Sequence, residues 1–257
     1  MAASVKIRFN DATRCFGAFV ALEKLNLEVM DSEFVTIVGP SGCGKSTAMN
    51  MAAGLLMPSS GSVTIDGEAV SGPGPERGVI FQQYALFPWL TVRKNVEFGL
   101  RLKGMKERER RERAMHYIEL VGLADFADAL PKTLSGGMKQ RCAIARAYAV
   151  DPKVLLMDEP FGALDALTRV RMQDQLLGTW TRERKTVMFI THDVDEAVYL
   201  ANRVIVMAAK PGRLQEIIEV DLPYPRNEEL RLSARFTEIR NRVWHAVYTR
   251  AAPALQP

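Results

Sequence analysis

The chain has 257 residues, with 34 Lys and Arg against 30 Asp and Glu, so its net charge is +4 at pH 7. Hydrophobic residues make up 47% and charged residues 25%, as in soluble globular proteins that bury a sizeable core. This charge is too weakly basic to indicate nucleic-acid binding by itself. The three scattered cysteines are typical of reduced thiols, and we expect neither a signal peptide nor a membrane span.

The hydrophobic pattern predicts strands and helices in alternation along most of the chain. Strands are expected where apolar and polar residues alternate or a short apolar run is bounded by turn residues, over 5–9, 22–29, 33–39, 61–67, 76–82, 153–159, 186–191 and 203–209. Helices are expected over 45–54, 166–180 and 193–201, and residues 91–149 show helical spacing only. A C-terminal helix that packs on the body is predicted by Leu232, Phe236, Ile239, Val243 and Val247.

This order of elements predicts an α/β protein with a parallel sheet core. The first strands are expected to form a small antiparallel β subdomain. We predict a core made of 1–90 and 150–220, an inserted helical subdomain at 91–149, and a C-terminal helical tail at 221–257.

A glycine-rich segment lies between the third predicted strand and the first predicted helix. It fits the phosphate-loop pattern G-x-x-x-x-G-K-S/T and comprises Gly39, Pro40, Ser41, Gly42, Cys43, Gly44, Lys45, Ser46 and Thr47. In a strand–loop–helix context, backbone N–H groups and the helix N-terminus surround phosphate oxygens. We expect Lys45 to reach the β- and γ-phosphates of ATP and the Ser46 hydroxyl to ligate Mg²⁺. Lys45 and the helix N-terminus also predict a reactive thiolate at Cys43, against the alternative of a buried, inert thiol.

Polar side chains at three other strand ends complete a candidate hydrolytic site. Asp158 ends an apolar strand and is predicted to hold Mg²⁺ through water, and Glu159 is predicted to deprotonate the attacking water. His192 follows another apolar strand, at the sheet edge where ligands bind, and is a candidate sensor of the γ-phosphate. Gln82 is a candidate contact to both Mg²⁺ and the water.

The segment LSGGMKQR, from Leu134 to Arg141, places two glycines directly before residues with helical spacing. A Gly-Gly pair usually marks a turn, so we predict a turn at Gly136 and Gly137. A helix that starts there would present its N-terminus to an anion.

These motifs together, with GALD at 162–165, resemble those of the ATPase subunits of ABC transporters. The resemblance covers nearly the whole chain and implies a P-loop, RecA-like parallel sheet core. It implies that Ser135, Gly136 and Gly137 bind the γ-phosphate of ATP held by a second subunit, and that Asp165 couples the two sites. Met138 stands where the family more often has Gln.

The resemblance also implies contacts to adenine and to a membrane protein. Phe16 matches the aromatic residue that stacks on adenine, with Phe19 as a close competitor. The aromatic segment, Tyr84–Leu90, matches a surface that receives a short helix from a membrane subunit, although its side chains could equally be core.

A finer similarity links the chain to the ATPases that energise nitrate, sulfonate and taurine import. It implies a homodimer, or a dimer with a close paralogue, at the cytoplasmic face of the plasma membrane. The expected partners are integral membrane permease subunits and, indirectly, a periplasmic or extracellular solute-binding protein. Alternatives are an ABC ATPase of another importer or exporter, or a soluble ABC ATPase that acts on DNA or ribosomes. A small-molecule P-loop kinase would not need the LSGG segment.

Overall fold

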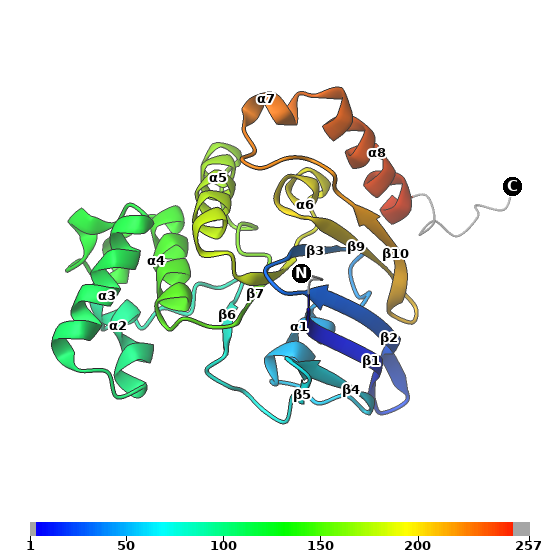
Figure 1. The fold of residues 1–257 in the computed structure, drawn as a ribbon, viewed down its shortest axis with the longest axis horizontal. Helices are drawn as coiled ribbons and strands as arrows, with labels where there is room; N and C mark the ends of the chain where they lie inside the picture. The colour runs from blue at the N-terminus through cyan, green and yellow to red at the C-terminus, as the bar shows by residue number, and fades with distance from the viewer. Residues whose placement is uncertain (1–3, 249–257) are drawn as a thin grey trace, which may run out of the picture. The chain divides into compact units, whose positions relative to one another are not determined.

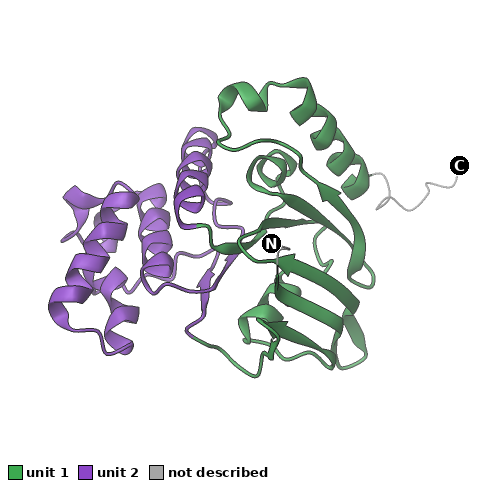
Figure 2. Cartoon of the chain, viewed as in Figure 1, with its two compact units in different colours: residues 1–74, 184–257 green, residues 75–183 purple. Residues whose placement is uncertain are grey.

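The structure is a computed structural model, which describes residues 4–248. Contacts divide the chain into two compact units, one formed by residues 1–74 and 184–257 and the other by residues 75–183 (Figure 2). These units differ in their limits from the predicted domains, whose boundaries stay a prediction. Among the described residues, no helix combines the length and the apolar character needed to cross a membrane.

The first unit contains an antiparallel sheet with the strand order β2-β1-β4-β5 (Figure 1). Its strands are β1 (Val5–Phe16), β2 (Phe19–Met30), β4 (Ser60–Ile65) and β5 (Glu68–Ala69). Alternate residues such as Ile7 and Phe9 are buried, as expected for a sheet with one covered face. This confirms the predicted antiparallel sheet, although β1 and β2 are longer than the sequence pattern indicated.

A mixed sheet in the same unit has β3 (Phe34–Val38) between two parallel neighbours, β8 (Thr186–Ile190) and β9 (Arg203–Ala208). Every residue of β3 and β8 is buried, which explains why their sequences are apolar apart from Thr36 and Thr186. The helices of this unit are α1 (Lys45–Ala53), α6 (Val194–Leu200), α7 (Glu228–Arg231) and α8 (Ala234–Tyr248). The predicted α/β class is confirmed.

The end of the first unit departs from prediction in two places. An unpredicted strand, β10 (Arg213–Glu219), pairs antiparallel with β9. The predicted C-terminal helix is present as α8, and Phe236, Ile239, Val243 and Val247 are buried. Leu232 precedes α8 and is 80% exposed, so its assignment to the packed face was wrong.

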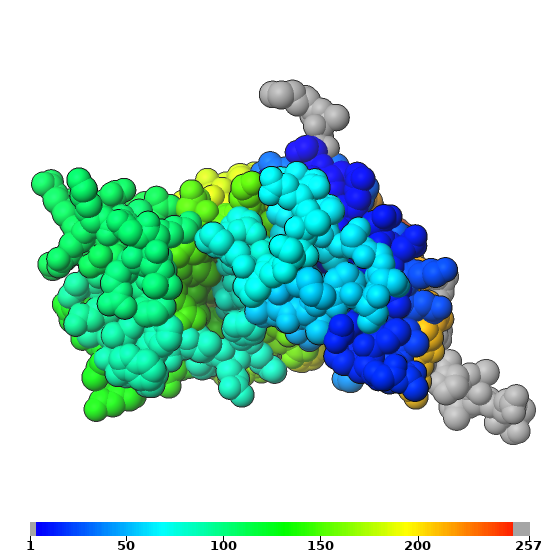
Figure 3. Space-filling view, turned by 90° about the horizontal axis from the view of Figure 1, so that it is seen from below, coloured from blue at the N-terminus to red at the C-terminus, as the bar shows by residue number. Residues whose placement is uncertain are grey.

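The second unit combines a parallel strand pair with helices. Its strands are β6 (Arg77–Ile80) and β7 (Val154–Asp158), and its α-helices are α2 (Val92–Leu102), α3 (Glu107–Leu120), α4 (Gly136–Ala149) and α5 (Ala166–Glu183). Short 3₁₀ turns at Ala124–Phe126 and Pro131–Thr133 connect α3 to α4. The predicted helical character of 91–149 is confirmed, and the space-filling view shows this segment in green (Figure 3).

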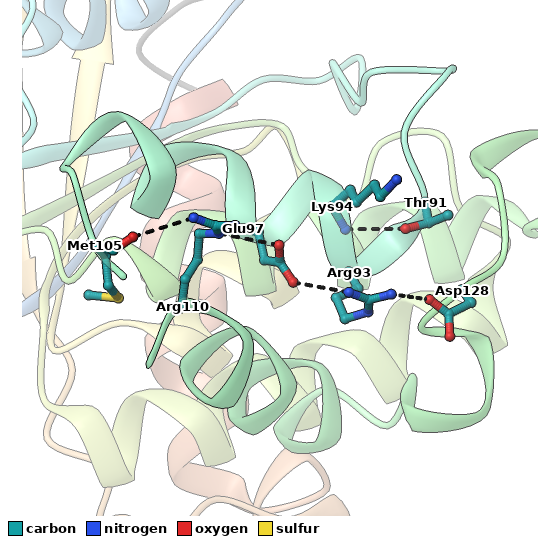
Figure 4. Close-up of polar contacts among 7 residues, drawn as sticks. All are labelled: Thr91, Arg93, Lys94, Glu97, Met105, Arg110 and Asp128. Carbon is teal, nitrogen blue, oxygen red and sulfur yellow. Dashed lines mark hydrogen bonds and ion pairs between the residues drawn. The ribbon is translucent and has the colours of Figure 1, made fainter. Parts of the chain in front are cut away.

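An ionic network fixes α2 against α3 (Figure 4). The carboxylate of Glu97 accepts hydrogen bonds from Arg93 and Arg110, both at 3.3 Å. Arg93 also donates to Asp128 at 2.6 Å, and Arg110 donates to the carbonyl of Met105 at 3.3 Å. Glu97 is nearly buried and Arg93 and Arg110 are half-buried, so these pairs are less screened by solvent than ordinary surface pairs. Part of the network lines a cavity of about 270 Å³.

Candidate functional site

The predicted phosphate loop lies in the first unit, between the carboxyl end of β3 and the first turn of α1. Lys45 donates from its Nζ to the carbonyl oxygens of Gly39, at 2.8 Å, and Pro40, at 3.2 Å. Ser41, Gly42 and Ser46 are exposed, so their polar groups face solvent at the start of the helix. A loop with this shape presents both N–H groups and a cation to an anion.

Two glycines of this loop are required by the backbone itself. Gly39 has φ +152°, and a Cβ there would lie 2.4 Å from the carbonyl oxygen of Met207. Gly44 has φ +88°, and a Cβ there would lie 3.0 Å from the carbonyl oxygen of Ala21. The backbone of the loop is therefore packed against β2 and β9, which stabilises its curved conformation.

The prediction of a reactive thiolate at Cys43 was wrong. The side chain is fully buried, and burial raises the pKa of the thiol even though Lys45 lies nearby and acts in the opposite direction. The distance from Lys45 Nζ to Cys43 Sγ is 3.8 Å. Desolvation of the charged form outweighs the attraction of the cation, so Cys43 is a packing residue of the loop.

His192 lies at the same edge of the mixed sheet as the phosphate loop. Ile37 of β3 pairs in parallel with Ile190 of β8, so the segments that follow these strands leave the sheet at matching positions. His192 is exposed, and Asp193 caps α6 by accepting a hydrogen bond from the N–H of Glu196 at 3.1 Å. This is the edge at which parallel sheets bind ligands.

Phe16 and Phe19 face each other at the tip of the β1–β2 hairpin. They are a directly opposed antiparallel pair, and they are 49% and 63% exposed. Directly opposed residues of such a pair project to one face of the sheet. The guanidinium carbon of Arg14 lies 4.6 Å from the centre of the Phe16 ring.

Gln82 and Glu159 come together in the second unit. Ile80 of β6 pairs in parallel with Met157 of β7. Gln82 and Glu159 each follow two positions later in the chain, so they lie at equivalent places beyond the two strands. The side-chain amide of Gln82 donates to the carboxylate of Glu159 at 3.5 Å. Glu159 has φ +43°, a left-handed conformation that is unfavourable for a residue with a Cβ and is found often at functional sites.

Two residues near Gln82 and Glu159 were missed by the sequence analysis. A Cβ on Gly162 would lie 3.7 Å from both the Gln82 amide nitrogen and the Glu159 carboxylate, so Gly162 keeps space open beside the pair. Arg146 donates to the carbonyl oxygens of Ala85 at 2.7 Å and Tyr84 at 3.3 Å, which fixes the segment after Gln82. Arg146 occupies an ordinary helical position in the sequence, so no local pattern could have indicated this contact.

Ser135, Gly136 and Gly137 of the LSGG segment, which we call the signature, lie at the N-terminus of α4, also in the second unit. Ser135 is the exposed N-cap, and its Oγ accepts a hydrogen bond from the N–H of Met138 at 3.3 Å. A hydroxyl that accepts one bond can still donate its own proton to a ligand. The first N–H groups of the helix lack partners within the helix, so the exposed end suits an anion.

Gly136 and Gly137 do not form the predicted turn, because α4 already begins at Gly136. A Cβ on Gly137 would lie 2.9 Å from the Thr168 methyl group of α5, and a Cβ on Gly136 would lie 3.1 Å from the Tyr84 hydroxyl. The glycine pair is therefore explained by close packing around the first turn of α4 and not by a change of chain direction.

Asp165 is exposed and stands directly before α5. Its Oδ1 accepts a hydrogen bond from the N–H of Thr168 at 3.0 Å. This bond holds the pKa of the Asp165 carboxyl below its usual value. Asp165 is thus a helix cap, which leaves its predicted coupling role as a prediction.

The aromatic segment 84–90 is partly exposed. Trp89 is 72% exposed, and its ring centre lies 5.7 Å from that of Phe87, which lies 4.5 Å from that of Phe98 in α2. The alternative in which all side chains of this segment belong to the core therefore does not account for Trp89.

The residues expected to hold Mg²⁺, namely Ser46, Gln82 and Asp158, offer the hard oxygen donors that this ion prefers. Ser46 and Gln82 are exposed, and Asp158 at the end of β7 is half-buried. Within residues 4–248, no group of three or more His, Cys, Asp or Glu side chains has an arrangement suited to another metal.

Comparisons with known proteins agree with these motifs. A family model described as ABC transporter matches residues 22–162. The chain is 74% identical over 243 residues to a Brucella abortus protein whose name describes it as ATP-binding, covering 95% of this chain and 94% of that one. It is 51% identical over 221 residues to a nitrate import ATP-binding protein of Synechocystis, with 84% and 83% covered.

Two further relatives extend the comparison. An aliphatic sulfonates import ATP-binding protein of Bacillus cereus is 45% identical over 241 residues, with 92% of this chain and 94% of that one covered. A solved dimeric bacterial ABC transporter cassette matches with a TM-score of 0.75 at 34% identity, covering 84% of this chain and 100% of that one. The family model spans more than half of the chain, and the chain therefore belongs to the ABC transporter family as an ATP-binding subunit that hydrolyses ATP.

Proposed function

We propose that this chain is the ATP-hydrolysing subunit of an importer for a small oxyanion such as a sulfonate, taurine or nitrate. Two copies close around two ATP molecules, and their closure moves partner membrane subunits. The observation that carries this proposal is the exposed, Ser135-capped N-terminus of α4, an anion-binding end on a chain that already has a phosphate loop of its own. Relatives named for nitrate and sulfonate import support the substrate class.

The phosphate loop binds and orients the ATP. Lys45, which donates to the loop carbonyls of Gly39 and Pro40, transfers these hydrogen bonds to the β- and γ-phosphates when nucleotide enters. The backbone N–H groups of residues 42–47 surround the phosphate oxygens. Ser46, Gln82 and Asp158 would hold Mg²⁺, which would supply positive charge to neutralise the charge that develops during phosphoryl transfer.

Glu159 accepts the proton of the attacking water. The Gln82 amide, 3.5 Å from the Glu159 carboxylate, orients the same water, and His192 donates to the γ-phosphate. Water adds to the γ-phosphorus, the bond to the β-phosphate oxygen breaks, and ADP leaves. The γ-phosphate then no longer joins the two subunits through ATP, and the dimer reopens. Phe16 stacks on the adenine ring, and Asp165 couples one site of the dimer to the other.

The signature of each copy serves the ATP of its partner. The Ser135 hydroxyl and the N–H groups of Gly136 and Gly137 bind the partner's γ-phosphate. ATP then links two chains, so closure requires intact nucleotide and hydrolysis reverses it.

The aromatic segment 84–90 receives a helix from a membrane permease subunit. Exposed Trp89 supplies an apolar anchor, and Leu90 and Phe98 line the cavity beside α2, whose other lining residues are charged. Exposed aromatic side chains of this kind are common at protein interfaces. The chain is then peripheral at the cytoplasmic face of the membrane, and a solute-binding protein on the opposite side delivers the oxyanion.

The complex itself provides the test of this function. The tagged chain is purified from detergent-solubilised membranes with its permease, reconstituted with the solute-binding protein, and assayed for ATPase stimulation by sulfonates, taurine and nitrate. We expect a multi-span subunit to co-purify and one of these anions to raise the ATPase rate. A chain that purifies without any multi-span protein, or an ATPase that ignores all three anions, contradicts the proposal.

One substitution examines the docking surface separately. Trp89→Glu should remove the chain from the permease while the isolated chain still binds ATP, because Trp89 lies outside the nucleotide residues. Arg108→Glu is the matched control, since Arg108 is a 92% exposed side chain on α3 paired only with Glu112 among the ion pairs of the described residues. The control should co-purify as the wild type does.

A further inference from the structure

The tip of the β1–β2 hairpin contains a cation for which the proposed function has no role. Arg14 is half-buried, and its guanidinium carbon lies 4.6 Å from the centre of the Phe16 ring. Its Nη1 donates to the carbonyl oxygen of Met57 at 2.9 Å. Its Nε is buried without a hydrogen-bond partner among the described residues, so the guanidinium is oriented by the ring and one carbonyl.

The contacts around Arg14 tie the hairpin to the chain that follows the phosphate-loop helix. Besides the Arg14–Met57 bond, the N–H of Cys15 donates to the Ser59 hydroxyl at 3.0 Å, and the N–H of Ser59 donates to the carbonyl of Thr13 at 2.7 Å. Residues 57–59 follow Gly54, the C-cap of α1, after two intervening residues. The strand end that carries Phe16 is therefore held on both sides of Arg14.

A guanidinium over one face of an aromatic ring limits what the ring can bind. It occupies that face, so a nucleobase can stack only on the other. It also draws electron density toward itself, which makes the free face a better partner for an electron-rich purine. The Phe16 side chain is itself 49% exposed, so part of the ring remains accessible to a ligand although Arg14 lies over one face.

We propose that Arg14 is a positioning residue for adenine recognition: it holds the Phe16 ring from behind, in the orientation in which its free face stacks on the base of ATP. This inference rests on the proposed role of Phe16. It adds a cation to the base-binding site, and it favours Phe16 over Phe19 as the platform.

The experiment separates binding of the base from binding of the phosphates. Dissociation constants for ATP and for inorganic triphosphate are measured by calorimetry on the full chain at one Mg²⁺ concentration. Both ligands use the phosphate loop, and only ATP has a base. The ratio of the two constants therefore isolates adenine recognition, and unchanged triphosphate affinity shows that a variant is folded.

For Arg14→Met we expect ATP to bind roughly two- to fivefold more weakly, the size of one cation–π contact, with triphosphate binding unchanged. Phe16→Ala should weaken ATP binding more, by roughly fivefold or above, as for loss of a base-stacking ring. The double variant should be no worse than Phe16→Ala alone, because Arg14 acts through the ring. Arg8→Met is the control: Arg8 is on the same strand, 52% exposed and paired with Glu28, and its loss should change neither constant.

The other outcomes are informative in distinct ways. If Arg14→Met weakens triphosphate and ATP equally, the residue serves the loop or the fold and the inference is wrong. If ATP binds more tightly to Arg14→Met, the cation covers the face that the base needs, which also overturns it. If Phe16→Ala changes the ratio and Arg14→Met does not, only this inference fails. If Phe16→Ala leaves the ratio unchanged, the proposed role of Phe16 fails and this inference fails with it.

Discussion

At the scale of single residues, the conformation of Glu159 is the least expected feature of the second unit. A side chain at φ +43° costs about 1–3 kcal/mol relative to an ordinary backbone conformation. The next residues compensate in part, because the N–H of Gly162 donates to the Glu159 carbonyl at 3.1 Å. Strain of this kind is retained where a side chain must point in one direction, as a general base must.

Replacing Glu159 by Gln keeps the size of the side chain and removes its ability to accept a proton. We expect the ATPase rate to fall by at least roughly 10²-fold, the usual contribution of a general base, with no change in the dissociation constant for ATP. Stable dimers should accumulate with ATP and Mg²⁺ in size-exclusion chromatography, because the bridging phosphate survives. Glu112→Gln, on the exposed face of α3, is the control and should leave the rate unchanged. A variant that hydrolyses ATP at near the wild-type rate rules out Glu159 as the base.

The chemical role of a residue could be predicted from the sequence only where a motif determines which groups lie around its side chain. Gln82 and Glu159 were each predicted separately, from their positions after predicted strands, to act on the attacking water. Their mutual contact was not predicted, and the parallel register of β6 and β7 brings them to 3.5 Å. The Cys43 thiolate was predicted from two neighbours that stabilise negative charge. Its burial could not be foreseen, because the side chain packs under Gly39, where the ideal Cβ position lies 2.8 Å from Cys43 Sγ.

At the scale of elements, the first turn of α4 shows why a signature segment contains two glycines. The sequence indicated a turn, and the structure has a helix start packed so closely on α5 that a Cβ at Gly137 would lie 2.9 Å from the Thr168 methyl group. Packing of this kind depends on contacts between segments about thirty residues apart, which no local pattern contains. Strand β10 was missed because the burial of its residues does not alternate, so its sequence lacks the alternating pattern by which a strand is predicted.

Alanine substitutions at two helical glycines measure this packing. Gly178 of α5 has open space around its Cβ position, whereas Gly137 does not. Gly178→Ala gains roughly 1 kcal/mol of helix propensity in the interior of α5, whereas Gly137 lies in the first turn of α4 and gains less. We expect the free energy of unfolding of Gly137→Ala to lie below that of Gly178→Ala by about 1–3 kcal/mol, the cost of overpacking. Urea denaturation of both variants gives the difference, and equal midpoints would show that α4 can move away from α5 at little cost.

At the scale of the whole molecule, the predicted site residues are divided between the two compact units. The phosphate loop, Phe16 and His192 belong to the first, and Gln82, Asp158, Glu159 and the signature belong to the second. The sequence predicted the order of these motifs and the fold class, since alternating strands and helices have a strong local signal. Which strands and helices share a compact unit is decided by contacts distant in sequence. The limit at residue 74 coincides with the Gly/Pro-rich stretch 72–75, whereas the limit at residue 183 falls at the end of α5 without a comparable local signal.

The central claim is that the signature of one chain serves the ATP of another. Ser135→Arg places a bulky cation at the exposed N-terminus of α4 and leaves the chain's own phosphate loop intact. Lys45→Ala removes the cation that we propose contacts the phosphates. If the claim holds, both variants lose hydrolysis, yet only Lys45→Ala loses affinity for ATP. Mixing the two variants should restore some ATPase, provided that one competent site in the mixed dimer suffices.

The most direct measurement is the dissociation constant for ATP on monomeric Ser135→Arg, determined by calorimetry below the concentration at which dimers form. The account predicts a value within about twofold of the wild type, while Lys45→Ala binds ATP far more weakly. If Ser135→Arg loses affinity as severely as Lys45→Ala does, the signature serves the nucleotide of its own chain and the two-chain mechanism is wrong.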